Sequence, residues 1–420
     1  MPYPLIRAIL VLSLLGIVVP VQPAAAAPLE LAQRRPRRAE DYLNPLDIPP
    51  HTDPLLPDRL RQTTPPRRPA PLPPLEPGEQ AQLARDLVDL ATEAQRAFEQ
   101  DQKERAYELW FRELRLRRLL GPIAEVEALA RVGGMAWEEN RNQDVAAISS
   151  RLEAIEAAAS SEDLALIRAL GQAYRQVRLY PNAVAMYERQ LATLPPNALN
   201  QRSPLLKVVA ELHRDWFQFE RAIGVYQELL TMARSQFDLD NVQNYLGELA
   251  HLYDQTEQWQ EAIATRETLL LAYGEKQRIE RFAPLRMAMA ANALALGNGE
   301  QASEFYQQAF TFAWAAQQYA YAGDALEALA QLYSDYGQVE EAINLYRERI
   351  KAAQYAYDRY AVMETYNRLA QLHRRQGNYT AALNALRSGR EVALELGHRE
   401  GYFEEAMELL IQEQFERLDR

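Results

Sequence analysis

The chain contains no cysteine and only four lysines among 420 residues. The absence of cysteine excludes disulfide bonds, thiolate catalysis and metal sites built on cysteine ligands. No two of the five histidines lie three or four residues apart, so the helical arrangement in which two histidines bind one metal ion is also absent. We therefore expect neither a metal ion nor another cofactor.

Positive charge is scarce relative to negative charge. The sequence holds 58 acidic and 46 basic residues, which gives a net charge of −12 and an isoelectric point near 5.2. Nucleic-acid binding requires clustered lysine and arginine to neutralise phosphates. The composition therefore excludes nucleic acid as an expected partner.

The N-terminus has the pattern of a secretory signal. Arg7 is the only charge before an apolar run over residues 8–19, Pro20 follows, and small residues occupy positions 24–27. The run is shorter than the roughly 20 residues that span a bilayer. The pattern predicts a signal peptide over residues 1–26. It also predicts export through the inner membrane into the periplasm or an equivalent lumen, or further to the cell exterior. After cleavage no stable membrane span is expected. The alternative is an uncleaved N-terminal anchor.

Residues 27–78 hold 14 of the 24 prolines. Proline fixes its own backbone angle and disfavours helix in the residue before it, so this segment is expected to be an extended, disordered linker. Such segments also serve as ligands for aromatic grooves, and that alternative stays open.

From residue 79 onward the sequence repeats itself. Small residues recur at two positions twelve residues apart, at steps of 37 to 40 residues, and no stretch alternates with the period of a strand. Self-similarity at this period is typical of an array whose units bury their apolar faces against one another. The first small position holds Ala94, Gly134, Gly171, Ala210, Ala250, Ala290, Ala330 and Ala370, and the second holds Ala106, Ala146, Ala183, Ala222, Ala262, Ala302, Ala342 and Ala382.

One copy shows the predicted unit. Apolar residues from Leu326 to Tyr333 lie three and four residues apart, Gly337 interrupts the pattern, and a second amphipathic stretch begins near Val339. Two helices joined by a turn are expected, with Ala330 and Ala342 at their closest approach.

This unit resembles the tetratricopeptide repeat family, which has small residues at positions 8 and 20 of each repeat and aromatic residues at positions 11 and 24. The copy with Gly171, Tyr174, Ala183, Tyr187 and Pro195 is the best match. The step near 40 residues exceeds the usual 34, as in the extended-helix branch of the family. The first two copies match weakly.

The resemblance implies an all-α fold: a right-handed α-solenoid of about eight helix-turn-helix repeats over residues 79–397. An amphipathic stripe after Gly397 predicts a capping helix over residues 398–420. A cap accounts for this stripe without oligomerisation, so a monomer is expected.

Two catalytic motifs occur without their required context. His213-Arg214-Asp215 echoes a kinase catalytic loop but lacks its downstream asparagine. Gly297-Asn298-Gly299 begins a dinucleotide-binding pattern, but a helical stretch rather than a strand precedes it. We therefore expect a protein that is not an enzyme.

The resemblance also implies that the first helix of each repeat lines a concave groove. In this chain the groove positions form a basic band, an acidic band that includes Glu248, Asp254 and Glu327, and a second basic band. The basic residues and amides expected to bind a partner are Arg131, Arg168, Gln172, Arg175, Gln176, Lys207 and Arg214 in the first basic band and Arg368, Arg374 and Arg375 in the second.

The function expected from these features is a protein-interaction scaffold that holds a protein or peptide partner, with acidic segments favoured by the basic bands. The alternative for the bands is that they are ordinary solvated helix faces. Position 9 never carries asparagine, so the family's carboxylate clamp for chaperone C-termini is not supported. A second hypothesis is a sensor that binds a peptide or small ligand and changes its superhelical pitch.

An apolar stretch of groove positions, which includes Met287, Ala291 and Leu294, separates the acidic residues. It is either an apolar groove floor suited to an amphipathic helix or the result of a shifted helical register that buries these side chains.

Overall fold

The computed structural model describes residues 44, 46, 50, 52–61, 73–275 and 278–418. Within these ranges the chain forms seventeen α-helices, two short 3₁₀ helices and no strand. The predicted signal peptide and most of the predicted linker lie outside the described residues. No described helix is both long enough and apolar enough to cross a membrane.

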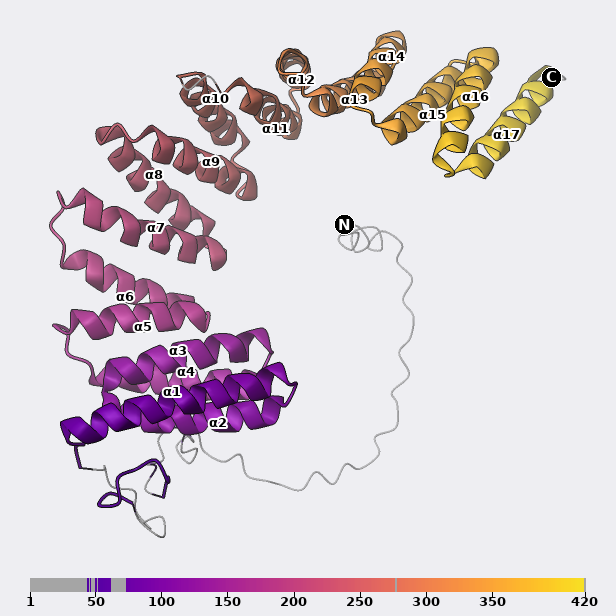
Figure 1. Ribbon diagram of the computed structural model, residues 1–420. Coiled ribbons are helices and arrows are strands. Elements are labelled where there is room, and N and C mark those ends of the chain that lie inside the picture. The colour runs from indigo at the N-terminus through magenta and orange to yellow at the C-terminus, as the bar shows by residue number, and fades with distance from the viewer. Residues whose placement is uncertain are drawn as a thin grey trace, which may run out of the picture. The chain divides into compact units, whose positions relative to one another are not determined.

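The helices follow one another along the chain in the order shown in Figure 1. They are α1 (Pro77–Glu99), α2 (Lys103–Arg117), α3 (Pro122–Glu138), α4 (Asn142–Ala158), α5 (Leu164–Gln176), α6 (Tyr180–Ala192), α7 (Leu199–Asp215), α8 (Phe219–Ser235), α9 (Leu239–Gln255), α10 (Trp259–Glu275), α11 (Phe282–Ala295), α12 (Gly299–Ala315), α13 (Tyr319–Asp335), α14 (Val339–Tyr355), α15 (Arg359–Arg375), α16 (Tyr379–Leu396) and α17 (Glu400–Leu418), with 3₁₀ helices η3 (Arg118–Leu120) and η4 (Ile279–Arg281).

Each odd-numbered helix from α1 to α15 packs on the even-numbered helix that follows it, and each pair packs on the next. Eight such pairs precede the single helix α17, which packs on α16. This arrangement confirms the predicted all-α solenoid of eight helical pairs with one further helix at its end.

The recurring small residues form the contact inside the pairs, except in the second pair, where Ala146 is exposed. Ala330 on α13 and Ala342 on α14 are both fully buried, and the nearby Tyr346 is only 2% exposed. Methyl side chains let the two helix backbones approach closely, while the tyrosine ring fills the space beside that contact. The spacing of twelve residues therefore marks the contact between the two helices in seven of the eight described pairs.

A left-handed backbone residue ends the first helix of the later pairs. Gly337 has φ +77°, and the next residue, Gln338, donates its backbone N–H to the carbonyl oxygen of Tyr333 at 2.8 Å. Residues with side chains rarely adopt such an angle, which explains the recurrence of glycine at this turn. Phe217 and Glu257 hold the same turn position in earlier pairs with φ near 58°.

Part of the predicted linker is packed rather than disordered. Leu56, Leu60 and Leu75 are at most 6% exposed and belong to one apolar cluster with leucines of α1 and α2. Burial of apolar side chains offsets the entropy lost on ordering the chain. Proline content alone did not reveal these leucines, so the expectation of a disordered linker is wrong for the described residues 52–61 and 73–76.

An ion pair holds the same segment to the second helix. The guanidinium of Arg112 on α2 donates to both carboxylate oxygens of Asp53, at 2.7 and 2.8 Å. Such a bidentate pair has a fixed geometry and is stronger than an ordinary hydrogen bond.

Candidate functional site

The predicted first basic band begins on α3. Arg131 lies there and donates to Glu113 of α2 at 2.6 Å. Glu113 is fully buried and also accepts from Arg117. Arg131 therefore balances the negative charge of a buried carboxylate, and this ion pair links α2 to α3.

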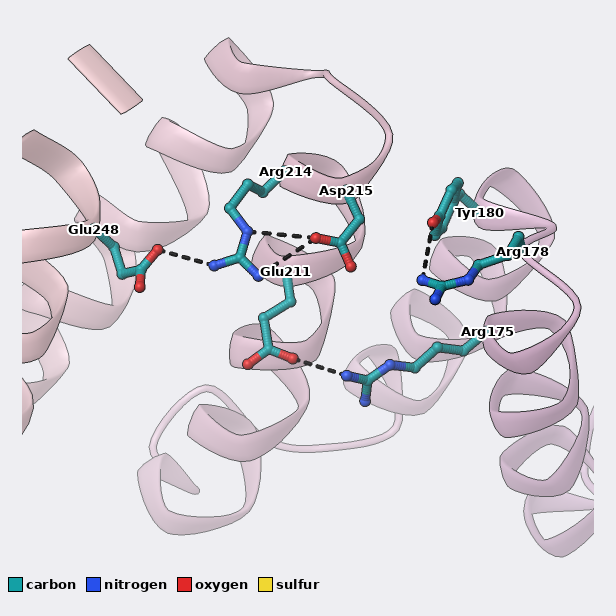
Figure 2. Close-up of polar contacts among 7 residues, drawn as sticks. All are labelled: Arg175, Arg178, Tyr180, Glu211, Arg214, Asp215 and Glu248. Atoms are coloured by element: carbon teal, nitrogen blue, oxygen red, sulfur yellow. Dashed lines mark hydrogen bonds and ion pairs between the residues drawn. The ribbon is translucent and has the colours of Figure 1, made fainter. Parts of the chain in front are cut away.

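Figure 2 shows that two further cations of this band, Arg175 and Arg214, are also paired with acids. Arg175 of α5 donates to Glu211 of α7 at 3.1 Å. Arg214 of α7 donates to Glu248 of α9 at 3.0 Å and is also bonded to Asp215. Each arginine thus meets an acid of the following pair, and these contacts neutralise much of the predicted positive band.

Four members of the band make no hydrogen bond or ion pair with any described residue. All four are exposed: Arg168, Gln172 and Gln176 lie on α5, and Lys207 lies on α7. The structure places these side chains on the first helices of two consecutive pairs. They remain candidates for partner binding.

The predicted acidic band is neutralised as well. Asp254 of α9 accepts from Arg266 of α10 at 3.0 Å and from Asn292 of α11 at 2.8 Å. Glu327 of α13 accepts from the buried Arg349 of α14. The banding seen in the sequence is therefore largely a set of ion pairs between helices.

The apolar residues of α11 at the groove positions are not buried by a shift of the helical register. Leu294 is 39% exposed, Ala291 and Ala295 are exposed, and Met287 is half-buried. The alternative in which a shifted register buries them does not describe this helix.

The second basic band borders a cavity of about 770 Å³ between α15, α16 and α17. Two contacts bridge its walls: Arg374 donates to Glu413 at 2.7 Å, and the hydroxyl of Tyr402 donates to Asn367 at 3.0 Å. The apolar lining residues are Ala370, Leu386, Ala406, Leu409 and Leu410, and the polar ones are Asn367, Gln371, Arg374, Arg375, Tyr402, Glu405, Glu413 and Arg417. We call this cavity the C-terminal groove.

Leu409 is the unusual residue of this groove. It lies forty residues after Leu369, at the position just before the first small residue of a repeat. Leu409 is 57% exposed, whereas its counterparts in the third to eighth pairs are at most 5% exposed. The counterparts are Leu170, Val209, Leu249, Met289, Leu329 and Leu369.

The sequence analysis treated α17 only as a cap and missed its side chains as groove residues. The stripe of Tyr402, Ala406 and Leu409 at helical spacing was visible. What the spacing did not show is that α17 packs on α16 while a cavity separates it from α15.

One histidine, His213, is packed in the interior of the fold. His213 is 4% exposed, and its Nδ1 lies 3.2 Å from the side-chain oxygen of Gln218. Burial lowers the pKa of His213 below its ordinary value and keeps the ring neutral. No group of three histidine, aspartate or glutamate side chains among the described residues is placed to hold a metal ion.

Sequence comparison agrees with this repeat geometry. The family model for the tetratricopeptide repeat matches residues 165–201, 246–280 and 325–354. Each match begins in the first helix of a pair and continues into the second. The chain carries tetratricopeptide repeats over these segments. This repeat fold is typical of non-catalytic interaction scaffolds, which present extended concave surfaces.

Several solved structures are similar to this tetratricopeptide repeat chain. BtubC (BKLC) from P. vanneervenii is 21% identical, with 53% of this chain and 91% of that chain covered and a TM-score of 0.37. The C-terminal part of a TPR repeat-containing protein from Cytophaga hutchinsonii is 12% identical, with 63% and 95% covered and a TM-score of 0.40. The apo form of RapI is 12% identical, with 74% and 98% covered and a TM-score of 0.39. No curated protein sequence matches the chain.

Proposed function

We propose that this tetratricopeptide repeat protein is an exported, non-enzymatic scaffold that holds a segment of a partner protein in the C-terminal groove. The observation that carries the proposal is the exposure of Leu409 beside a cavity of about 770 Å³. A concave site with an apolar floor and a few polar groups at its rim is the usual form of a binding site.

The charges at the rim favour a partner segment that carries both an apolar side chain and an acidic group. Arg374 is paired with Glu413, but Arg375 and Arg417 make no ion pair with a described residue. These two cations outnumber the remaining unpaired rim acid, Glu405. An acidic partner would form charge-assisted hydrogen bonds with them.

The contribution of Leu409 can be sized. Burying a whole leucine side chain contributes about 1.5–3 kcal/mol, so covering the exposed half of Leu409 contributes about 1 kcal/mol. That corresponds to roughly a five-fold change in the dissociation constant.

Photo-crosslinking from single positions tests the binding surface. A photo-reactive amino acid is placed at Gln371 or Leu409 in the groove, and at the control Arg387, an exposed residue of α16 that does not line the cavity. We expect one dominant crosslinked protein from both groove positions and none from Arg387. Equal crosslinking from all three positions would refute the groove as the binding surface.

Export is proposed from residues 1–26, whose charge, apolar run and small residues match a secretory signal. N-terminal sequencing of the chain from fractionated cells provides the test. We expect a mature chain that begins at residue 27 and is found outside the cytosol. An intact N-terminus in the cytosolic fraction would contradict export and would leave the groove proposal standing.

A further inference from the structure

A small cavity lies between the first helices of two neighbouring repeats, α13 and α15, beside α14. Its volume is about 90 Å³. Apart from Leu372, its lining consists of side chains that are able to form hydrogen bonds: Gln331, Ser334, Tyr346, Arg368, Gln371 and Arg375. Three different helices therefore supply donors to one small space.

The lining carries two positive charges and no negative one. Arg368 and Arg375 both come from α15, and neither forms an ion pair with a described residue. Of the nearby carboxylates, Glu327 is paired with Arg349, whereas Asp335 accepts from the neutral amide of Gln331 at 2.8 Å and keeps its charge. The lining itself carries a net positive charge from Arg368 and Arg375.

One buried atom without a hydrogen-bond partner lines this cavity, and a tyrosine hydroxyl lies beside it. The Nε of Arg368 is buried and has no hydrogen-bond partner among the described residues, an arrangement that costs free energy. Tyr346 is only 2% exposed, and burial raises its pKa, so its hydroxyl keeps its proton and can donate at neutral pH.

We propose that this cavity binds a phosphate-type tetrahedral oxyanion through Arg368, Arg375 and the neighbouring amide and hydroxyl groups. A guanidinium matches two phosphate oxygens at once. A carboxylate offers two oxygens in one plane, whereas a tetrahedral oxyanion presents oxygens to donors on three helices. The volume equals the liquid share of about three water molecules, which suits a small ion.

Binding would join two repeats, because its contacts come from α13 and α14 on one side and α15 on the other. A ligand that binds only the folded state raises the unfolding temperature with a saturable dependence on concentration. This site adjoins the proposed C-terminal groove and shares Gln371 and Arg375 with it. Arg368 lines only the small cavity and Arg374 lines only the groove, so substitutions at these two positions tell the sites apart.

The experiment measures the unfolding temperature of the full chain against inorganic phosphate at constant ionic strength. We compare the unaltered chain with Arg368→Gln and with two controls that each remove one positive charge, Arg374→Gln in the groove and Arg387→Gln on α16. The expected result is a saturable rise for the unaltered chain and both controls, and at least a ten-fold weaker response for Arg368→Gln.

Further ligands define the chemistry. Acetate should bind at least ten-fold more weakly than phosphate. A comparison of O-phosphoserine with inorganic phosphate shows whether the cavity prefers a phosphate monoester or the free ion, because the preferred ligand binds more tightly. An unchanged response of Arg368→Gln would overturn the proposal. So would acetate binding equal to that of phosphate, or a rise without saturation in every variant, which is the general effect of an excluded salt.

A second variant covers the case in which Arg368→Gln does not fold. Arg375 is exposed, so Arg375→Gln should preserve the fold and still weaken the response at least ten-fold. The side-chain Nε–H signal of Arg368 in an arginine-labelled chain should also shift on phosphate addition. A signal that stays in place at saturating phosphate would contradict the assignment.

Discussion

Adding one methyl group at two helical glycines should change stability in opposite directions. A Cβ built on Gly224 of α8 meets no atom within 4 Å. A Cβ built on Gly389 of α16 would lie 2.4 Å from Cε1 of Phe403, the fully buried ring that anchors α17. The chemical change is identical, so any difference reports on the packing of α17.

The magnitudes follow from two opposing contributions. Replacing glycine by alanine inside a helix stabilises it by about 1 kcal/mol, which is the whole expected effect of Gly224→Ala. In Gly389→Ala the ring of Phe403 must leave its position, and burial of a phenylalanine side chain is worth about 1.5–3 kcal/mol. The net result for Gly389→Ala is a destabilisation of roughly 0.5–2 kcal/mol.

Hydrogen exchange of α17 read by mass spectrometry is the appropriate assay, with urea unfolding followed by circular dichroism as a second measure. Because the loss is local to α17, amide exchange there should accelerate roughly 2- to 30-fold in Gly389→Ala. Exchange in α17 should not change in Gly224→Ala. Equal stabilisation by both substitutions would refute the packing of α17 on α16 described above.

Three further predictions concern charged and titratable groups. Burial alone would raise the pKa of Asp53, but its hydrogen bonds with Arg112 and a backbone N–H hold this pKa below 3.8. The stabilising contribution of Asp53 is therefore complete above pH 3.8 and is lost as the pH falls further. Asp53→Asn should therefore expose residues 52–61 to proteolysis at neutral pH. Unchanged protection would show that the ion pair between Asp53 and Arg112 does not hold this segment to α2. Burial lowers the pKa of His213 below 6.5, so protons bind the unfolded chain preferentially. The urea concentration at the unfolding midpoint should therefore fall as the pH drops from 6.5. His213→Phe should reduce this dependence of the midpoint on pH. The pair between Arg214 and Glu248 is about one-third exposed at both ends, so Arg214→Gln should change the unfolding free energy by less than about 1 kcal/mol, and a larger change would show a structural role.

The repeat architecture was predictable from the sequence because one local rule recurs in every unit. Residues such as Ala330 and Ala342 lie twelve positions apart, and that spacing alone places them at a helix–helix contact. The packing of Leu56 and Leu60 was not predictable in the same way. Their segment is rich in proline and does not repeat, so no period indicated that these leucines meet α1 and α2.

The candidate site was only partly predictable, for a different reason. The positions of Arg175 and Arg214 on the first helices followed from the repeat register. Their partners, Glu211 and Glu248, lie more than thirty residues away in the next pair, and only the structure showed that the charges meet. The exposure of Leu409 likewise depends on the space between α15 and α17, which the spacing of residues does not determine.

The most direct test of partner binding in the C-terminal groove is the affinity of the segment crosslinked from Gln371, measured by calorimetry against three forms of the full chain. The account predicts about five-fold weaker binding for Leu409→Ala, from the loss of roughly 1 kcal/mol of apolar burial. It predicts unchanged affinity for the double variant Arg168→Gln with Lys207→Gln, whose side chains lie outside the groove. The opposite pattern, with full affinity in Leu409→Ala and weakened binding in the double variant, would contradict it.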